Sequence, residues 1–491
     1  MKYLCKLNTE KNLNNIYGDI IVKMFRFLES LERYSNECAF KFLDGENTVS
    51  ISFEQYYSDV KKCAYNLEQI MGSVEGKHIA AIGLNSYEYV VVICALMFSR
   101  AVLIPLNFRE TQDNLSYAVK HAEVEYLISD MSKDYDFGPE VKNLKFGDVL
   151  GGENEKELYD FTDDEAEKLF MIVFTSGTTS LSKGVALSIG NIFKEEKIAL
   201  PEKYSHGFKA VPGFRVYTNF PFYHIGGLLA WVTWAEHGCT MIQSANPMNV
   251  LEDLLHQEID YACVIPATVK LWLKQIRRGN MERLGNVKII TTAGAPVNVD
   301  DVKEIQAHGI AFGQYYGMTE CGGNITFNFD MENHIASVGR CYDDGSVEII
   351  DGEICARYWG NMMGYYKDEE ETAKVLKDGL IYTGDLGYVD DEGYVFITGR
   401  KKNLIILSGG ENVSPEEIER NLYKNTNVKE CIVYENNDRI YAGIYCDESN
   451  QEEIQAYVNE LNKTMPIYKR INKIEFQNKE FEKNSLGKLK R

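Results

Sequence analysis

The chain has 491 residues, of which 45% are hydrophobic and 25% charged. This length is too great for one hydrophobic core and predicts about two to four domains of roughly 150 residues each. The formal net charge of −21 argues against a general nucleic-acid-binding protein and against a protein that coats anionic membranes.

The cysteine pattern and the hydropathy predict a cytoplasmic protein without a membrane span. The 11 cysteines are dispersed and form no zinc-finger spacing with the 8 histidines, which suits a reducing compartment. The first ten residues contain no apolar signal core. The longest apolar run, 89–98, is too short to cross a bilayer and predicts a buried helix. The oligomeric state stays open.

Helix and strand signals alternate through the first 300 residues. Residues 53–70 have helical periodicity, 78–84 predict a strand, 87–98 a helix and 102–106 the next strand. This rhythm predicts a parallel sheet flanked by helices, a fold that binds ligands beyond the carboxyl ends of its strands. Further strands are predicted at 125–128, 170–174, 261–265 and 287–292.

The pattern changes after about residue 335. Short strand signals separated by Asp-Gly or Glu-Gly turns predict a smaller β-rich unit, with strands at 346–350, 351–356 and 393–397. We place a domain boundary at about residue 400, where the chain reads Gly-Arg-Lys-Lys. Ser414, Pro415 and two glutamates then predict the N-cap, first position and first-turn acids of a helix over 414–422.

A loop rich in hydroxyl side chains follows the apolar strand signal at 169–174. Residues 174–185 read Phe-Thr-Ser-Gly-Thr-Thr-Ser-Leu-Ser-Lys-Gly-Val. Small residues let a backbone wrap an anion, while hydroxyls, N–H groups and a lysine supply donors and charge, so a polyphosphate is the favoured ligand. The spacing is not that of a P-loop ATPase, because Lys183 precedes its glycine and no Ser or Thr follows. A plain surface loop is the simpler alternative.

Four further segments could complete a nucleotide site. Residues 313–320 offer aromatic rings for a base and, at Glu320, a carboxylate for Mg²⁺. Asp385, between glycines, could accept from ribose hydroxyls. The basic stretch after Gly399 suits a hinge, and the tail 484–491 is basic. Taken singly, each has a simpler interpretation: a turn, a capping aspartate, a solvated linker and a mobile tail.

Taken together, these five motifs resemble, in order and spacing, the adenylate-forming superfamily of acyl- and aryl-CoA ligases, stand-alone adenylation domains and beetle luciferases. The resemblance covers about residues 53–488. It implies an α/β fold: a large AMP-binding domain, 1–399, with mixed, mostly parallel sheets flanked by helices and a β-rich subdomain from about 335. A small mobile α+β domain, 400–491, would carry the catalytic lysine.

The resemblance also implies the site residues by position. Tyr316 would stack on adenine, Thr319 would contact phosphate and Glu320 would hold Mg²⁺. Asp385 would bind ribose, with Arg400 as a second ribose or phosphate contact. The residues implied to contact ATP or coenzyme A are Thr175, Ser176, Gly177, Thr178, Thr179, Lys183, Gly294, Ala295, Pro296, Tyr316, Gly317, Thr319, Asp385, Arg400, Gly409 and Gly410.

Three residues are implied to act in catalysis. Lys488 corresponds to the catalytic lysine of the small domain and Lys402 to its hinge. His224 stands where CoA ligases carry a histidine near the substrate carboxylate, with a packed core histidine as the alternative. Ser180 and Ser182 stand where the family usually has Gly and Pro, so we expect a strained or looser loop and slower turnover or weaker ATP affinity.

The implied reaction has two steps. A carboxylate attacks the α-phosphate of ATP and pyrophosphate leaves; the small domain then rotates about Lys402, and a thiol attacks the acyl-adenylate. The segment around His224 lacks the Asp with which amino-acid-activating members pair a substrate ammonium. Its aromatic neighbours suit an aryl or medium-sized apolar acid, although such clusters are more often plain core.

We therefore expect an AMP-forming acid–thiol ligase that uses ATP, Mg²⁺ and coenzyme A on a small carboxylic acid. The first alternative is an acyl-AMP ligase that loads the phosphopantetheine arm of an acyl carrier protein. The second is a non-catalytic nucleotide-binding relative, which only Ser180 and Ser182 favour.

Overall fold

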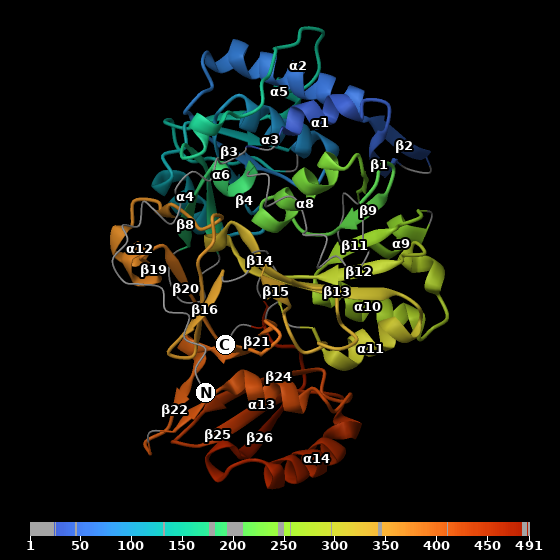
Figure 1. Cartoon of the computed structure of the whole chain (residues 1–491), viewed down its shortest axis with the longest axis vertical. Coiled ribbons are helices and arrows are strands. Elements are labelled where there is room, and N and C mark those ends of the chain that lie inside the picture. The colour runs from blue at the N-terminus through green and yellow to red at the C-terminus, as the bar shows by residue number, and fades with distance from the viewer. Residues whose placement is uncertain are drawn as a thin grey trace.

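The computed structural model describes residues 24, 26–44, 47–130, 133–175, 182–193, 210–243, 250–255, 257–295, 297–341, 346–409, 411–483 and 489. The elements near the C-terminus, from β24 (Glu430–Glu435) to α14 (Gln451–Thr464), lie at one end of the molecule (Figure 1).

The first large sheet has seven strands in the order β18-β8-β7-β4-β3-β5-β6. The strands from β7 to β6 run parallel, whereas β8 lies antiparallel to both β7 and β18. The strands are β3 (His78–Ile82), β4 (Val102–Leu106), β5 (Tyr126–Ser129), β6 (Lys142–Lys145), β7 (Leu169–Thr175), β8 (Lys183–Ser188) and β18 (Gly364–Tyr365). The helices of this half are α1 (Phe27–Arg33), α2 (Phe53–Met71), α3 (Tyr87–Phe98), α4 (Gln112–His121), α5 (Phe146–Val149) and α6 (Gly190–Phe193).

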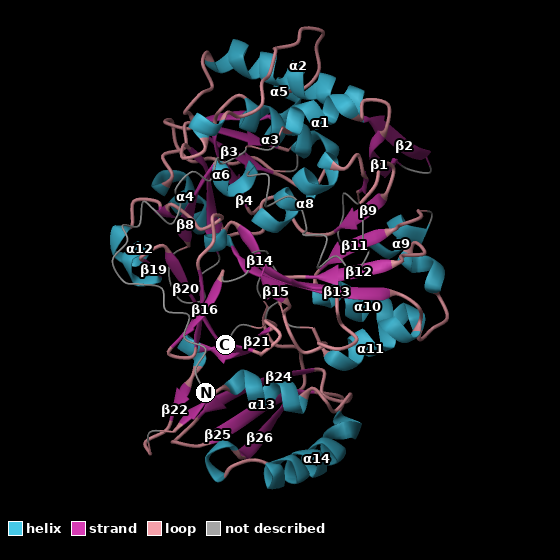
Figure 2. Cartoon of the chain, viewed as in Figure 1, coloured by secondary structure: helices cyan, strands magenta, loops and turns pink. Residues whose placement is uncertain are grey.

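Helices cover both faces of this sheet (Figure 2). In β3, Ile79 and Ala81 join the core that contains α2 and α3, while Ala80 and Ile82 join the core that contains α4. Successive side chains of a strand point to opposite faces, so a strand buried on both faces needs an uninterrupted apolar run. This explains why the predicted strands of this half lack alternation.

The second large sheet has nine strands in the order β15-β14-β13-β12-β11-β9-β10-β1-β2. Its central strands, from β13 to β1, run parallel and its edges are antiparallel. The strands are β1 (Cys38–Asp44), β2 (Asn47–Ser52), β9 (Arg215–Thr218), β10 (Thr240–Ile242), β11 (Tyr261–Val264), β12 (Ile289–Thr292), β13 (Ala311–Met318), β14 (Gly323–Asn328) and β15 (Arg340–Cys341). Its helices are α8 (Ile225–Glu236), α9 (Val250–Leu255), α10 (Pro266–Ile276) and α11 (Val299–Ala307).

One hydrophobic core joins the two large sheets. It contains Leu103 and Met171 of the first sheet, Phe40 and Met241 of the second, and Trp231 of α8. The outer face of the second sheet has its own core with α10 and α11. The carboxyl ends of the parallel strands are thus held by packing on both faces, which makes them a rigid platform for a site.

A smaller sheet follows, in the order β16-β17-β20-β19, with β21 paired to β20. The turn between β16 and β17 has positive φ at both Asp351 (51°) and Gly352 (77°), as a two-residue Asp-Gly hairpin requires. The elements are β16 (Val347–Ile350), β17 (Glu353–Ala356), β19 (Leu376–Lys377), β20 (Leu380–Val389), β21 (Val395–Arg400) and α12 (Glu369–Val375).

The residues after Arg400 build a separate core. Ile418, Val433, Ile444 and Ile454 are buried in it, between a three-stranded sheet and two helices. The elements are the hairpin β22 (Ile405–Ile406) and β23 (Asn412–Val413), the sheet strands β24 (Glu430–Glu435), β25 (Ile440–Tyr445) and β26 (Ile471–Gln477), and the helices α13 (Pro415–Leu422) and α14 (Gln451–Thr464).

The predicted start of a helix at Ser414 is confirmed, with Pro415 and two glutamates in its first turn. Ser414 occupies the N-cap position of α13, but its side chain makes no cap hydrogen bond. The hydroxyl instead donates to the carbonyl oxygen of Thr398 at 3.0 Å, and Arg420 Nη2 donates to the same oxygen at 2.9 Å. Gly399 permits this approach, because a Cβ there would collide with Ser414 Oγ. These two hydrogen bonds tie α13 to β21.

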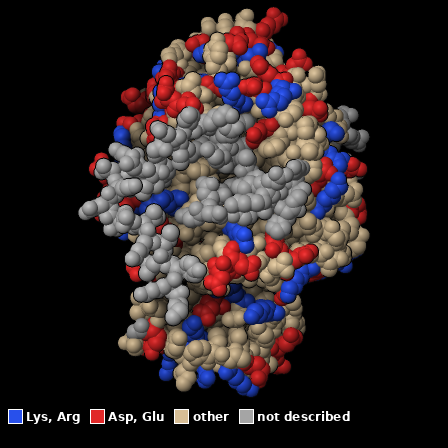
Figure 3. Space-filling model, viewed as in Figure 1, with Lys and Arg blue, Asp and Glu red and all other residues tan. Residues whose placement is uncertain are grey.

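Among the described residues, no helix combines the length and the apolar character needed to cross a membrane. On the face shown in Figure 3, Lys and Arg side chains are scattered among Asp and Glu side chains.

Arg100 and Glu165 form a bidentate ion pair, with Nε–Oε1 and Nη2–Oε2 distances of 3.2 and 3.1 Å. Burial opposes ionisation of Glu165, but hydrogen bonds from Arg100 and the Thr162 N–H lower its pKa to about 2. Because the folded-state pKa lies below the ordinary value, the pair stabilises the fold at neutral pH, and this stabilisation is lost as pH falls towards about 2.

We therefore expect Glu165→Gln to lower the free energy of unfolding at pH 7 by about 2 kcal/mol. The difference from wild type should shrink between pH 5 and pH 3, as measured by urea denaturation. Glu167→Gln, at an exposed neighbouring position, is the matched control. A loss that stays constant with pH would contradict the ion-pair account.

Candidate active site

Two of the predicted site residues converge on the buried carboxylate of Asp385. The Tyr316 hydroxyl donates to Asp385 Oδ2 at 2.8 Å, and Arg400 Nε lies 2.6 Å from Oδ1. The position of Arg400 follows from strand pairing, because Asp385 in β20 and Arg400 in β21 are cross-strand partners. The Asp385 side chain is 6% exposed and the Arg400 side chain 41%, so Asp385 is the buried centre of a polar cluster that reaches the surface through Arg400.

The segment of β20 that presents Asp385 is fixed by its own hydrogen bonds. The Asp385 N–H donates to Thr383 Oγ1 at 3.1 Å, and the Thr383 hydroxyl donates to the Ile354 carbonyl at 2.7 Å. The N–H of Gly384, whose φ is 72°, donates to Glu353 Oε1 at 2.8 Å. The carboxylate is therefore held by the sheet rather than by a mobile loop.

Tyr316 stays protonated in this setting. Burial and then the charge of Asp385 raise the pKa of its hydroxyl well above the usual value. The next residue, Gly317, forms a bulge against β14, and a Cβ there would collide with the Gly323 carbonyl oxygen. Only glycine fits this close approach, which turns the chain from Tyr316 towards Glu320.

Glu320 lies in a short 3₁₀ helix, Thr319–Cys321, directly after β13. It is 9% exposed, and its Oε1 accepts a hydrogen bond from the Tyr365 hydroxyl at 3.0 Å. Burial and the negative charge of Glu320 raise the pKa of Tyr365, so this hydroxyl remains a donor. The remaining carboxylate oxygen is a hard ligand of the kind that Mg²⁺ prefers.

The described residues contain no cluster of three or more metal-binding side chains. A magnesium site with one protein carboxylate, completed by phosphate oxygens and water, needs no such cluster. The donor set at Glu320 therefore fits Mg²⁺ that arrives with a polyphosphate.

Lys183 is linked to Glu320 by Tyr365, which contacts both residues. Its ammonium is 4.9 Å from the centroid of the Tyr365 ring and forms an ion pair with Glu371 in α12. The described ends of the hydroxyl-rich loop meet each other, because Thr175 and Lys183 are paired across β7 and β8. Strand β18 pairs with β8 and places Tyr365 next to Lys183.

His224 lies near the same loop. It immediately precedes α8, and it lines a small cavity together with Phe174, Ser182 and Tyr223. The Tyr223 ring centroid is 4.7 Å from that of His224. Phe174 and Ser182 flank the hydroxyl-rich loop, so the structure brings His224 to its edge.

The other predicted residues that the structure describes lie in segments that follow strands of three different sheets. Gly294 (φ 84°) and Ala295 lie in the turn after β12, at the carboxyl end of the second sheet. Lys402 lies in the 3₁₀ helix Lys401–Asn403 directly after β21, and Gly409 is exposed between β22 and β23. The predicted residues outside the described part of the chain are Ser176, Gly177, Thr178, Thr179, Ser180, Pro296, Gly410 and Lys488.

Sequence reasoning missed Tyr365 and Glu371. The available signal was the segment Gly364-Tyr365-Tyr366, followed by four consecutive acids from Asp368 that begin α12.

Not every aromatic residue that lies near His224 in the sequence belongs to the candidate site. Trp231 stacks on Phe53 and donates to the Tyr56 hydroxyl, and so belongs to the core between the sheets.

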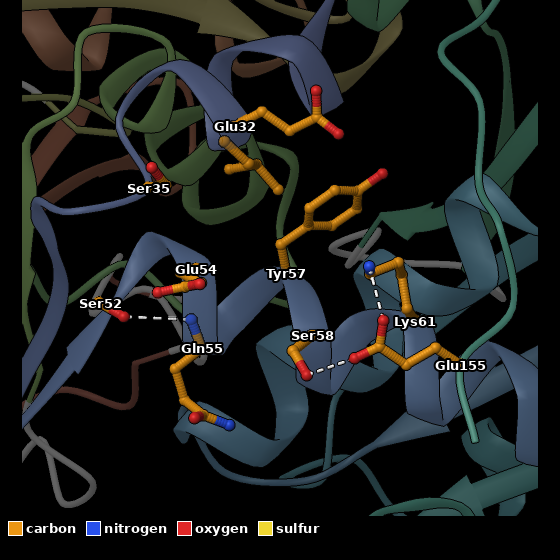
Figure 4. Close-up of a pocket in the computed structure, with 10 residues that line it drawn as sticks. Glu32, Ser35, Ser52, Glu54, Gln55, Tyr57, Ser58, Lys61 and Glu155 are labelled. Atoms are coloured by element: carbon orange, nitrogen blue, oxygen red, sulfur yellow. Dashed lines mark hydrogen bonds and ion pairs between the residues drawn. The ribbon is translucent and has the colours of Figure 1, made fainter. Parts of the chain in front are cut away.

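A larger pocket, of about 480 Å³, opens elsewhere, between α1, the N-terminal end of α2 and Glu155. Figure 4 shows that Ser58 donates to Glu155 and that Lys61 pairs with the same carboxylate, each at 2.6 Å. None of the predicted site residues that the structure describes lines this pocket. Several of its polar groups are paired with one another, and the candidate site remains the region of Asp385, Glu320 and Lys183.

Comparison with known proteins gives matches over most of the chain. The model of the family described as AMP-binding enzyme matches residues 27–366. A 2-succinylbenzoate–CoA ligase of Bacillus cytotoxicus is 29% identical over 417 residues, which cover 81% of each chain. A fatty acid–[acyl-carrier-protein] ligase of Streptomyces coeruleorubidus is 27% identical over 423 residues, which cover 78% of each chain.

The same fold occurs in a solved structure, that of an o-succinylbenzoate coenzyme A synthetase from Bacillus subtilis in complex with ATP and a magnesium ion. Its TM-score is 0.80 at 23% identity, and the match covers 95% of this chain and 98% of that one. The predicted α/β fold class, with large sheets flanked by helices and small sheets towards the C-terminus, is confirmed.

Proposed function

The chain belongs to the AMP-binding enzyme family, and on that basis we propose that it is an ATP-dependent carboxylic acid–CoA ligase. In the first step a carboxylate attacks the α-phosphate of ATP, which forms an acyl-adenylate and releases pyrophosphate. In the second step the thiol of coenzyme A attacks the acyl carbonyl, which forms a thioester and releases AMP.

The strongest support is the buried carboxylate of Asp385. Its oxygens accept from Tyr316 and pair with Arg400, which fixes their orientation. A carboxylate is an acceptor only, and in the complex Asp385 would accept hydrogen bonds from ribose hydroxyls. Tyr316 would offer its ring to adenine, and the turn at Gly294 and Ala295 would line the base.

The phosphates would lie between the hydroxyl-rich loop and Glu320. Thr175, Lys183 and Thr319 would contact them, together with the loop residues Ser176, Gly177, Thr178 and Thr179. Mg²⁺ held by Glu320 would neutralise charge on the phosphate oxygens. The Tyr365 hydroxyl keeps one oxygen of Glu320 oriented, so the other oxygen stays available.

The first step needs positive charge more than proton transfer, because a carboxylate attacks as the anion. Charge grows on the phosphoryl oxygens as pyrophosphate leaves. We propose that Lys488, from the small C-terminal domain, supplies the charge that is present only when this domain is closed over the site.

The second step would use the same small domain in another orientation. Rotation about Lys402 would remove Lys488 and bring Gly409 and Gly410 towards the pantetheine arm. The separate core after Arg400 supports a rigid-body movement. Among the described residues, polar contacts across the hinge include the hydrogen bonds that Ser414 and Arg420 donate to the Thr398 carbonyl.

The acid is proposed to be an aryl or medium-sized apolar one. The cavity beside His224 supports a role for this histidine near the substrate carboxylate. Trp231 belongs to the core and does not contribute to the preference. The acceptor is proposed to be coenzyme A, and the cytoplasm is the proposed location, in keeping with the lack of disulfide bonds among the described residues.

Loading of an acyl carrier protein is the second candidate, which the similarity to a fatty acid–[acyl-carrier-protein] ligase favours. A pyrophosphate-release screen over aryl, short-, medium- and long-chain acids would identify the acid. The activated acid is then offered coenzyme A or a holo-carrier protein. We expect an acyl-CoA product; pyrophosphate release with thioester formed only on the carrier protein would overturn the choice of acceptor.

A further inference from the structure

Lys183, the lysine at the end of the hydroxyl-rich loop, already has an anionic partner in this structure. Lys183 forms an ion pair with Glu371, a residue 188 positions later in the first turn of α12. The two side chains are 31% and 29% exposed, so the pair lies at the border of the site rather than in the core.

Glu371 is firmly placed and doubly neutralised. Its N–H donates to Asp368 Oδ1 at 3.1 Å, the side-chain cap that begins α12. Its carboxylate pairs with Lys374 as well as with Lys183. Hydrogen bonds from Lys183 and then Lys374 lower the pKa of Glu371 to about 2, so the carboxylate is charged at every physiological pH.

Lys183 and the candidate magnesium ligand Glu320 both contact Tyr365. The ammonium lies over the Tyr365 ring at 4.9 Å, and the hydroxyl of the same ring donates to Glu320. A polyphosphate held by Glu320 through Mg²⁺ would therefore come close to the ammonium that Glu371 holds. Phosphate oxygens and the Glu371 carboxylate would compete for one cation.

We propose that Glu371 is the resting counter-ion of Lys183 and competes with the phosphates of ATP and pyrophosphate for this lysine. The inference rests on the proposed function and makes Glu371 a positioning residue, which acts on the nucleotide only through Lys183. A partly exposed ion pair is weak, and a polyphosphate carries more charge, so the exchange favours the nucleotide. Lys374 remains on Glu371 after the exchange, so no unpaired carboxylate is left behind.

Competition between Glu371 and phosphate oxygens for Lys183 would affect both ATP binding and pyrophosphate release. ATP must displace Glu371 to engage Lys183, which weakens its binding. Pyrophosphate leaves more easily, because Glu371 recaptures the lysine as the phosphates depart. The device would limit product inhibition by pyrophosphate at the expense of some ATP affinity.

The test compares Glu371→Gln with Glu370→Gln. Both remove one negative charge from the first turn of α12, but Glu370 pairs only with Lys374, at 3.0 Å, among the described residues. In Glu371→Gln we expect the KM for Mg-ATP and the inhibition constant of pyrophosphate to fall about two- to fivefold, a difference that added salt reduces. Thioester formation from supplied acyl-adenylate should keep its rate, and Glu370→Gln should behave as wild type.

Equal constants in the two variants, or a higher KM for Mg-ATP in Glu371→Gln, would overturn the proposal. Coincident thermal unfolding of the three proteins checks that α12 is intact. Calorimetric titration with Mg-ATP, without acid, tests the proposed function and the proposed role of Glu371 separately. Absence of ATP binding by wild type would refute the proposed function, whereas wild-type binding that Glu371→Gln leaves unchanged would refute only the role of Glu371.

Discussion

Replacing Lys488 with alanine is expected to slow acyl-adenylate formation by a factor on the order of 10²–10³, the largest effect that we expect of any single change. The reason is electrostatic. Negative charge develops on the phosphoryl oxygens in the transition state, and a preorganised ammonium stabilises that charge without reorganisation. The measurement is pyrophosphate exchange with the best acid from the screen.

The matched control is Lys490→Ala, which removes the same charge from the same basic tail. Thioester formation from supplied acyl-adenylate should remain near the wild-type rate in Lys488→Ala, because the lysine is proposed to leave the site before that step. Wild-type pyrophosphate exchange in Lys488→Ala would refute its assignment. Absence of exchange by the wild type with every acid would favour a non-catalytic nucleotide-binding relative.

Replacing Asp385 with asparagine is expected to weaken ATP binding roughly 10- to 100-fold, because hydrogen bonds to a charged acceptor are lost in a buried site. A carboxylate only accepts hydrogen bonds, whereas an amide has one acceptor oxygen and a donor nitrogen. In Asp385→Asn, either the Tyr316 hydroxyl or the Arg400 guanidinium would face another donor. The ribose hydroxyls would also lose acceptors.

Calorimetric titration with Mg-ATP in the absence of acid measures this effect. Asp378→Asn is a suitable control, because Asp378 is exposed on the same small sheet and asparagine tolerates its φ of 51°. Unchanged ATP affinity in Asp385→Asn would remove the main support for the proposed nucleotide site.

Much of the fold follows from local patterns in the chain. The apolar run at 78–84 forms β3, and the helical periodicity of 53–70 forms α2 with one further residue. These elements are predictable because burial on one face or on both imposes a period on the sequence. The helix start at Ser414 is also predictable locally, whereas the hydrogen bond from its hydroxyl to the Thr398 carbonyl is nonlocal, because it forms only when α13 packs against β21.

The candidate site likewise contains residues that the sequence predicts and partners that it does not predict. Lys183, Glu320 and Asp385 stand out from their sequence motifs, because loops that bind phosphate, magnesium or ribose need particular residue types at short spacings. The partners of these residues do not stand out. Tyr365 and Glu371 approach Lys183 only because β18 pairs with β8 and α12 follows at once.

The sequence by itself determined the class of protein: an α/β chain whose motifs, in order, indicate the formation of an acyl-adenylate from ATP. Only the tertiary structure decided how those motifs are joined, with Tyr316 and Arg400 on Asp385, Tyr365 on Glu320, and Glu371 on Lys183. The physical reason is distance along the chain. These pairings depend on strand order and register, which arise from packing of the whole domain, whereas periodicity and motif spacing record only local requirements.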